Sequence, residues 1–159
     1  MYEIERRFLI DVDAYSALSV DLKDPSYHIS QGYVTADPVV RIRSDERNGC
    51  ILALKSGRGL VRKEIEIPIS RDIFSQIWPM TLGLRIEKLR QRVRYDGRIV
   101  EVDTFLGHHH GLHLAEVEFP TVADAEAFTP PSWFGREVTH DSRYINAVLA
   151  RNGLPSAEP

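Results

Sequence analysis

The chain has 159 residues, of which 43% are hydrophobic and 27% are charged, with a formal net charge of −3 and a pI near 6.1. These values are typical of one globular domain with a sizeable core, and they exclude a disordered chain or a fibrous repeat. The acidic balance also argues against a protein that binds duplex DNA by broad neutralisation of phosphates. A polyanion would have to be bound at a local site.

Neither a membrane span nor a secretion signal is predicted. No apolar run approaches the roughly 20 residues that cross a bilayer, and the N-terminus carries Glu3, Glu5, Arg6 and Arg7, unlike a signal peptide. The single cysteine, Cys50, cannot form an internal disulfide. We therefore expect a cytoplasmic protein that is not held in a membrane.

Runs of alternating apolar and polar residues predict strands, separated by turn signals such as Asp96-Gly97. The predicted strands are residues 2–10, 27–35, 39–44, 50–55, 61–69, 84–95, 99–105 and 112–119. The predicted helices are a short one from Asp11 or Asp13 to Leu22, residues 71–80, residues 122–128, and a final helix with Asp141 as its N-cap. The chain is thus predicted to be one α+β domain over residues 1–151, followed by a loose tail over residues 152–159.

The first predicted strand, in "MYEIERRFLI", alternates with unusual regularity. Glu3, Glu5 and Arg7 fall on one face, and apolar side chains fall on the other. Taken alone, this pattern is typical of an ordinary edge strand with a solvated polar face. The other strands indicate whether such faces are surface or the lining of a cavity.

The same alternation recurs on other strands, and the sign of the charge is segregated by strand. The acids on these faces are Glu3, Glu5, Glu64, Glu66, Glu101, Asp103, Glu116 and Glu118, and the bases are Arg7, Arg41, Arg43, Lys55, Arg62, Lys88 and Arg90. A solvated surface would mix the two signs. Neighbouring carboxylates such as Glu116 and Glu118 would repel each other unless a cation lay between them. The segregation therefore favours a ligand.

A closed antiparallel barrel of about eight strands has room inside for side chains or one small ligand. Its lining here would be charged and its outside apolar, covered by the helices. Enclosed charges are costly unless they are paired or bound to metal. Hard divalent cations suit the carboxylates, and a polyphosphate suits the arginines and lysines.

A series of motifs carries a resemblance to a known family. The segments are "EIERRFL", "QGYV", "VRIRS", "LALKSG", "RKEIEIPI", "IEKLRQRV", "VEVDTF", "LAEVEF" and "WFGREVTHDSRYIN". Their order and spacing resemble the CYTH family of triphosphate tunnel enzymes, named for class IV adenylyl cyclase and thiamine triphosphatase, and most of all its small bacterial inorganic tripolyphosphatases. The resemblance implies an eight-stranded antiparallel tunnel, bound Mg²⁺ or Mn²⁺, and a triphosphate-bearing small molecule or inorganic polyphosphate as the ligand.

The resemblance also implies a role for each lining residue. The acids matching the family's metal site are Glu3, Glu5, Glu116 and Glu118, and those lining the same tunnel are Glu64, Glu66, Glu101 and Asp103. The residues expected to bind phosphate are Arg41, Arg43, Lys55, Arg62, Lys88 and Arg90. Arg143 of "DSRY" resembles a family arginine that reaches the tunnel mouth from the C-terminal helix.

One motif position departs from the family. The first motif there reads E-x-E-x-K, whereas Arg7 stands at the lysine position here. In related hydrolases that lysine works beside a tyrosine, which matches Tyr33 of "QGYV", to orient or activate water. Because arginine stays protonated and cannot act as a base, Arg7 is predicted to hold phosphate, and water activation is predicted to rest on the metal and Tyr33.

Three functions are open at this point. The first is metal-dependent hydrolysis of inorganic tripolyphosphate or another short triphosphate. The second is cyclisation of ATP to cyclic AMP, which needs an adenine and ribose pocket that the sequence does not reveal. The third is non-catalytic sensing of polyphosphate or nucleotide, which needs the phosphate clamp alone. A homodimer is kept as an alternative to a monomer.

Overall fold

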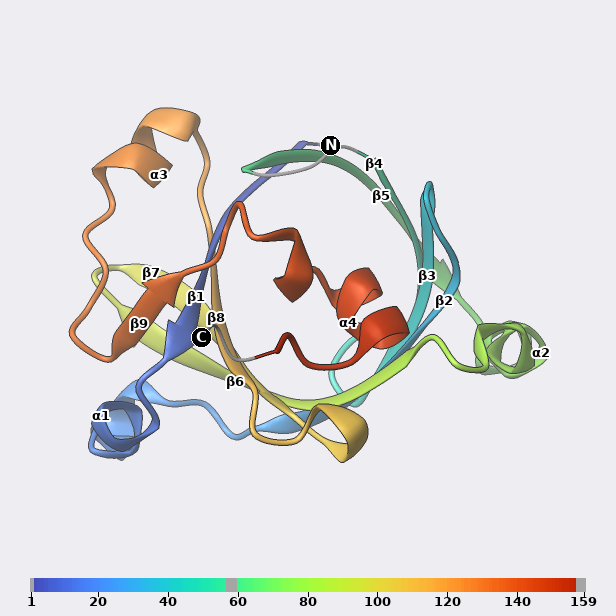
Figure 1. Ribbon diagram of the computed structural model, residues 1–159, viewed down its shortest axis with the longest axis horizontal. Coiled ribbons are helices and arrows are strands. Elements are labelled where there is room, and N and C mark those ends of the chain that lie inside the picture. The colour runs from blue at the N-terminus through green and yellow to red at the C-terminus, as the bar shows by residue number, and fades with distance from the viewer. Residues whose placement is uncertain (1, 57–59, 157–159) are drawn as a thin grey trace.

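The computed structural model describes residues 2–56 and 60–156, and its strands form a ring that Figure 1 shows end-on. The strands are β1 (Tyr2–Ile10), β2 (Tyr27–Ala36), β3 (Val39–Asp45), β4 (Gly49–Ser56), β5 (Val61–Ile69), β6 (Arg85–Tyr95), β7 (Arg98–Phe105), β8 (His113–Glu118) and β9 (Phe134–Glu137). The α-helices are α1 (Val12–Ser16), α2 (Arg71–Ile77), α3 (Val122–Ala127) and α4 (Asn146–Asn152). The 3-10 helices are η1 (Val20–Leu22), η2 (Trp78–Thr81), η3 (Gly107–His109) and η4 (Ser142–Tyr144).

The antiparallel sheet closes into a barrel through β1. The strands follow the order β5-β4-β3-β2-β6-β7-β8-β1, and β1 returns to pair with β5 at Tyr2, Glu3 and Ile4. Further along β1, Phe8 and Ile10 pair with β9, which lies outside the barrel. The predicted α+β fold with an eight-stranded antiparallel barrel is confirmed, and β9 is an addition that the sequence did not predict.

The predicted strands agree with the observed ones to within one residue at each end, whereas the helices differ more. The helix predicted over residues 71–80 ends at Ile77 and continues as η2, because Pro79 cannot donate an α-helical hydrogen bond. The helix predicted up to Leu22 divides into α1 and η1. Asp141 does cap a helix, but it caps η4, and α4 begins only at Asn146.

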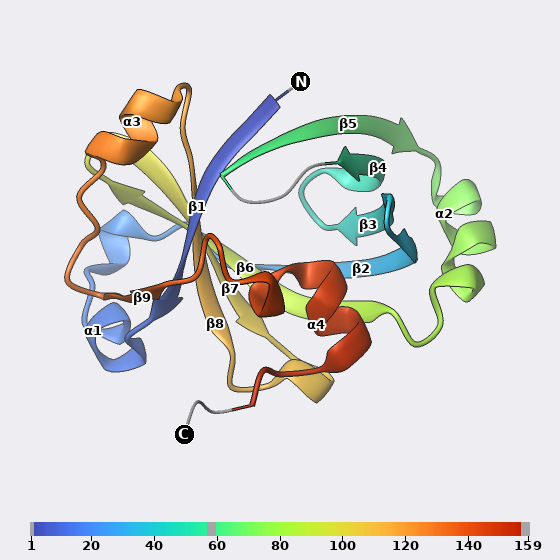
Figure 2. The same cartoon turned by 45° about the horizontal axis from the view of Figure 1, so that its top comes forward.

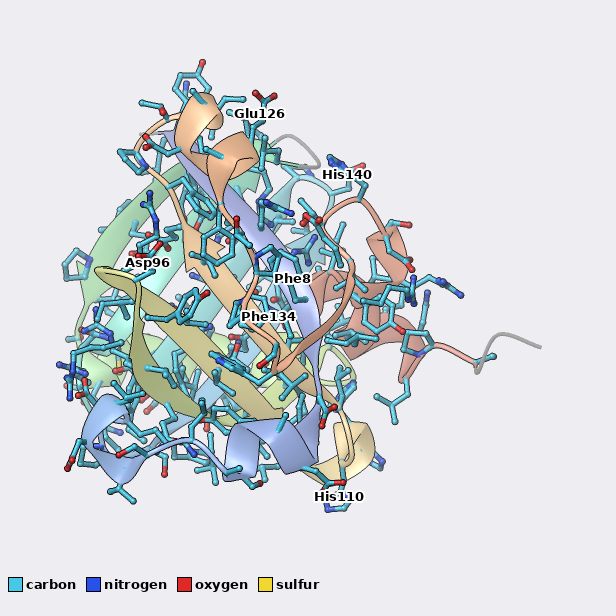
Figure 3. All side chains as sticks on the ribbon, turned by 90° about the vertical axis from the view of Figure 1, so that its left-hand side faces the viewer. Phe8, Asp96, His110, Glu126, Phe134 and His140 are labelled. Atoms are coloured by element: carbon cyan, nitrogen blue, oxygen red, sulfur yellow. The ribbon has the colours of Figure 1, made fainter. Side chains whose placement is uncertain are left out.

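One hydrophobic cluster lies outside the barrel wall, and a second, which includes Leu114 of β8 and Leu149 of α4, packs α4 against the inner face of the barrel. Apolar side chains on the outer faces of β1, β7 and β8, including Phe8 and Val102, form a buried cluster with Trp133 and Phe128. Phe8 of β1 and Phe134 of β9 lie next to each other (Figure 3), with ring centroids 4.6 Å apart. The helices α1 and α3 cover this side of the barrel and α2 covers the opposite side (Figure 1), so the apolar faces turn outward as expected.

Within the described residues, no helix combines the length and the apolar character that crossing a bilayer requires. The predicted boundary at residue 151 falls inside the last turn of α4, which ends at Asn152. Residues 157–159 of the predicted tail lie outside the described residues, and its looseness stays a prediction.

Gly32 of β2 occupies a position where η2 packs directly against the barrel. A Cβ atom at Gly32 would lie 2.5 Å from Oγ1 and 2.6 Å from Cβ of Thr81. Thr81 is fully buried and fixed, because its hydroxyl donates to the carbonyl of Trp78 and accepts from Nε of Arg85. Any side chain at position 32 therefore forces η2 away from β2.

We expect Gly32→Ala to lower the free energy of unfolding by roughly 1–3 kcal/mol, the usual cost of overpacking. Denaturant unfolding of the variant and the wild type measures the difference. Gly135→Ala in β9 is the matched control, because the nearest atom to its added Cβ would lie 3.4 Å away, and it should unfold close to the wild type. Equal stability of Gly32→Ala and the wild type would contradict this packing.

Candidate active site

The inward faces of the strands enclose a cavity of about 610 Å³. The predicted site residues that line it are Glu3, Glu5, Arg7, Tyr33, Arg41, Arg43, Lys55, Arg62, Glu64, Glu66, Lys88, Arg90, Glu101, Glu116 and Glu118. They meet there because side chains two residues apart on a strand share a face. The alternating charged faces are therefore the lining of a cavity, and only Asp103 and Arg143 of the predicted set are absent from it.

The helix α4 contributes part of the cavity wall. It lies across the ring of strands in Figure 1 and beside β2 and β6 in Figure 2, and it contacts both strands. Its residues Asn146, Val148 and Arg151 line the cavity. The buried ring of His109 holds the helix in place, with Nε2 lying 2.8 Å from the carbonyl oxygen of Leu149.

Asp103 lies on the inward face of β7, but it is 1% exposed and does not line the cavity. One carboxylate oxygen accepts from Nζ of Lys88 at 2.5 Å, and Arg90 donates to both oxygens at 2.7 Å. Burial opposes ionisation of Asp103, yet Arg90 and Lys88 hold its pKa well below the usual range. This placement does not support the predicted metal-binding role, because both oxygens already serve as the counter-charge of two bases.

Arg143, expected at the tunnel mouth, is not among the residues that line the cavity. Its Nε and Nη2 atoms donate to the carboxylate of Asp141 at 2.9 and 2.7 Å, and its side chain is partly exposed. The arginine that α4 places on the cavity is Arg151, which the sequence analysis missed. Once the final helix is known to begin at Asn146, Arg151 falls within it and Arg143 precedes it.

On the β3, β4 and β5 side of the cavity, the bases are paired with acids of β3, β5 and β1. Nη2 of Arg41 lies 3.0 Å from Oε1 of Glu66, and Nζ of Lys55 lies 3.0 Å from Oε1 of Glu64. Arg62 reaches across to β1, where its Nη2 donates to Glu3 at 3.2 Å and also to Glu5. The positive charges of the lining are thus neutralised by the negative ones.

The β1 and β8 side carries the excess of acid. Glu5 lies directly opposite Glu118 in the strand register, and Arg7 lies opposite Glu116. Burial and the charge of Glu116 raise the pKa of Glu5 to about 7, although Arg62 opposes the shift. Burial and the charge of Glu3 likewise raise the pKa of Glu118. Burial and the repulsion among these carboxylates together outweigh the attraction of the nearby bases.

Arg7 and Tyr33 stand on different walls of the cavity. The guanidinium of Arg7 donates to two backbone carbonyls of the C-terminal segment, from Nη1 to Tyr144 at 2.9 Å and from Nη2 to Thr139 at 3.2 Å. Tyr33 of β2 lies opposite Arg41 of β3 in the strand register. Burial raises the pKa of Tyr33 to about 12. Arg7 is thus tied to the segment that leads into α4, which is a structural role that the sequence analysis did not foresee.

Comparisons with known proteins fit this geometry. The chain is 41% identical to the inorganic triphosphatase of Nitrosomonas europaea over 94% of this chain and 97% of the relative, and 36% identical to that of Acetivibrio thermocellus over 94% of each. The crystal structure of the inorganic triphosphatase NE1496 covers 96% of this chain and 97% of its own, with 37% identity and a TM-score of 0.69. The chain belongs to the inorganic triphosphatase family.

Two further comparisons concern the shared fold and the family models. A protein described as an adenylyl cyclase of Hippeastrum with a dominant triphosphatase activity shares the fold, with a TM-score of 0.59 at 19% identity over 79% of this chain and 82% of that one. No protein-family model matches the chain. The resemblance to the triphosphate tunnel enzymes is therefore confirmed by whole-chain relatives and by the shared barrel.

The donor chemistry of this triphosphatase-family cavity suits a hard divalent cation. Among residues 2–56 and 60–156, no three acidic, histidine or cysteine side chains already stand together as a metal site. However, Glu3, Glu5 and Glu118 offer carboxylate oxygens, which Mg²⁺ and similar ions prefer. Burial first, and then repulsion by neighbouring carboxylates, raises the pKa of Glu5 and of Glu118, so the protein alone leaves these negative charges poorly balanced. A cation would remove that repulsion.

The shift at Glu5 predicts a pH dependence of stability without metal. The unfolded chain releases the Glu5 proton near pH 4.5 and the folded chain only near 7, so stability is lost as the pH rises between these values. Glu5→Gln, which cannot ionise, should be more stable than the wild type above pH 7 by roughly 1–3 kcal/mol and similar to it below 4.5. Denaturant unfolding in chelator across this range measures the difference.

The control for this experiment is Glu126→Gln, a carboxylate on the exposed face of α3 at the edge of the molecule (Figure 3). Its stability should follow that of the wild type at every pH. A Glu5→Gln variant that loses stability above pH 7 would show that Arg62 outweighs the repulsion and burial at Glu5.

Proposed function

We propose that this chain hydrolyses inorganic tripolyphosphate, or another short triphosphate, inside the barrel with the help of a divalent cation. The observation that carries the proposal is the enclosed cavity in which arginines and lysines of β3, β4 and β6 face the carboxylates of β1 and β8. A linear triphosphate is a polyanion of matching charge for the first group, and a cation matches the second. The two triphosphatase relatives, which match over nearly the whole chain, support the same reaction.

The residues of this chain would bind the substrate by exchanging partners. Arg41 and Arg43 present planar forks suited to phosphate oxygens, and their present partners include Glu66 at 3.0 and 3.8 Å. Phosphate oxygens that take these bases would free carboxylates of the lining. Lys88 and Arg90, fixed by Asp103, add positive charge where phosphate would lie.

The residues that would hold Mg²⁺ or Mn²⁺ are Glu3, Glu5, Glu116 and Glu118. The bound ion supplies charge neutralisation of the phosphate oxygens as the phosphoanhydride bond breaks. The chain itself orients the phosphate row with its arginines and lysines and limits the access of bulk water to the enclosed cavity.

The test is to supply tripolyphosphate or ATP with Mg²⁺ or Mn²⁺ and to measure orthophosphate, pyrophosphate and cyclic AMP. We expect orthophosphate and pyrophosphate from tripolyphosphate and no cyclic AMP from ATP. Cyclic AMP as the main product would favour the cyclase alternative, and binding without turnover would favour the sensor. Glu118→Gln is the matched variant, and it should lose at least tenfold in turnover at limiting metal because one cation ligand is gone.

The arginine at position 7 leads to a second prediction. Arg7→Lys should raise kcat, because burial at this position favours the neutral form of a lysine, which can act on water, whereas arginine stays protonated. The same change should lower the free energy of unfolding by about 1 kcal/mol, because a lysine cannot hold the carbonyls of both Thr139 and Tyr144. Steady-state phosphate release and denaturant unfolding measure the two effects separately.

Arg6→Lys is the control for Arg7→Lys. Arg6 is the next residue on β1 and points outward, where its Nη1 donates to the carbonyls of Ala125 and Phe128 at 2.8 and 3.1 Å. Its replacement should cost a similar amount of stability and leave kcat unchanged. An unchanged or lower kcat in Arg7→Lys, with Arg6→Lys normal, would show that position 7 does not limit catalysis.

A cytoplasmic location and the absence of DNA binding are also part of the proposal. The net charge of −3 supports the second, and the lone Cys50, which forms no disulfide, is compatible with a reducing compartment. The chain is either a homodimer or a monomer, and its molar mass from light scattering distinguishes the two.

A further inference from the structure

Two neighbouring side chains on the inner face of β2 form a buried pair. Gln31 is 1% exposed and Tyr33 is 3% exposed, and Nε2 of Gln31 donates to the hydroxyl oxygen of Tyr33 at 2.9 Å. Both residues line the cavity. In the strand register Gln31 lies opposite Arg43 and Tyr33 lies opposite Arg41, so the pair adjoins two of the proposed phosphate-binding arginines.

The hydrogen bond from Gln31 fixes the direction in which Tyr33 can donate. The O–H bond of a phenol lies near the plane of the ring and has two favoured directions in that plane. An N–H donor at one of these positions uses the oxygen as an acceptor and leaves the other for the hydroxyl hydrogen. Tyr33 is therefore left with a single donor direction, away from Gln31.

The charge state of Tyr33 agrees with the role of donor. Burial raises the pKa of this hydroxyl to about 12, with Arg41 opposing the shift and Glu116 reinforcing it. At neutral pH the group keeps its proton and is a poor base for taking one from water. This differs from the sequence-based prediction that Tyr33 takes part in activating water.

We propose that Gln31 is a positioning residue that aims the hydroxyl proton of Tyr33 at a phosphate oxygen of the bound triphosphate. Tyr33 then acts as a hydrogen-bond donor to the substrate, and no proton is transferred. Because negative charge on the phosphate oxygens is redistributed as the bond breaks, a donor fixed in advance stabilises the transition state more than the bound substrate. The inference rests on the proposed triphosphatase function and assigns a role to a residue outside the predicted site.

The test is a double-mutant cycle with Gln31→Leu, Tyr33→Phe and the variant that carries both changes. Gln31→Leu should lower kcat for tripolyphosphate by about tenfold or more with KM changed less than twofold, and Tyr33→Phe should lower kcat at least as much. In the Tyr33→Phe background, Gln31→Leu should have no further effect, because Gln31 acts only through the hydroxyl. Independent, multiplied losses in the double variant, or an unchanged kcat in Gln31→Leu, would overturn the proposal.

A second glutamine and tyrosine pair provides the matched control. On the outside of the barrel, Gln91 accepts from the hydroxyl of Tyr15 and donates to the carbonyl of Asp24. Gln91→Leu should lose stability and keep the wild-type kcat. If Gln31→Leu does not fold, Gln31→Met takes its place, because methionine has a similar length and no donor.

Phosphate release by the wild type shows whether the role of Gln31 or the proposed function itself is wrong. A wild-type chain that releases no phosphate from tripolyphosphate with Mg²⁺ or Mn²⁺ contradicts the function, and the inference falls with it. An active wild type with a fully active Gln31→Leu variant contradicts the role of Gln31 alone.

Discussion

The mutual neutralisation of acids and bases inside the barrel is the interaction on which the rest of the structure depends. An isolated ion in such an enclosed space would cost several kcal/mol. Here the buried Asp103 balances the charges of Lys88 and Arg90, and Arg62 joins β5 to Glu3 and Glu5 across the strand pair that closes the ring. Because the charges face inward, the apolar faces must turn outward, and they are covered by α1, α2, α3 and β9.

The balance is uneven, and this unevenness connects the fold to its function. The negative charge of Asp103 is more than balanced by Lys88 and Arg90, and these contacts keep the two bases in place. The negative charges of Glu5 and Glu118 are not fully balanced by nearby bases. The cavity therefore has fixed positive side chains on the side proposed for phosphate, and carboxylates that repel one another on the side proposed for the cation. A substrate that brings three phosphates and a divalent ion together would balance the charge on both sides at once. Neither the phosphates nor the ion alone would do so.

The sequence predicted the strands and most of the lining because period-two alternation reports which face a side chain occupies. It does not report how deeply a side chain is buried on that face. Asp103 therefore could not be distinguished from Glu101, although Asp103 is buried against Lys88 and Arg90 and Glu101 lines the cavity. The contacts of Arg7 were missed because their acceptors are backbone carbonyls far along the chain, which leave no residue signature. β9 has only four residues, and it is defined by its partner β1 more than by any pattern of its own.

A crystal structure of the chain with tripolyphosphate and Mg²⁺ or Mn²⁺ tests the exchange of partners most directly. The account predicts phosphate oxygens within hydrogen-bond distance of Arg41 and Arg43, a cation on carboxylates of β1 and β8, and Glu5 released from Arg62. Phosphate bound outside the cavity, with the Arg41–Glu66 and Arg62–Glu5 pairs intact, would contradict it.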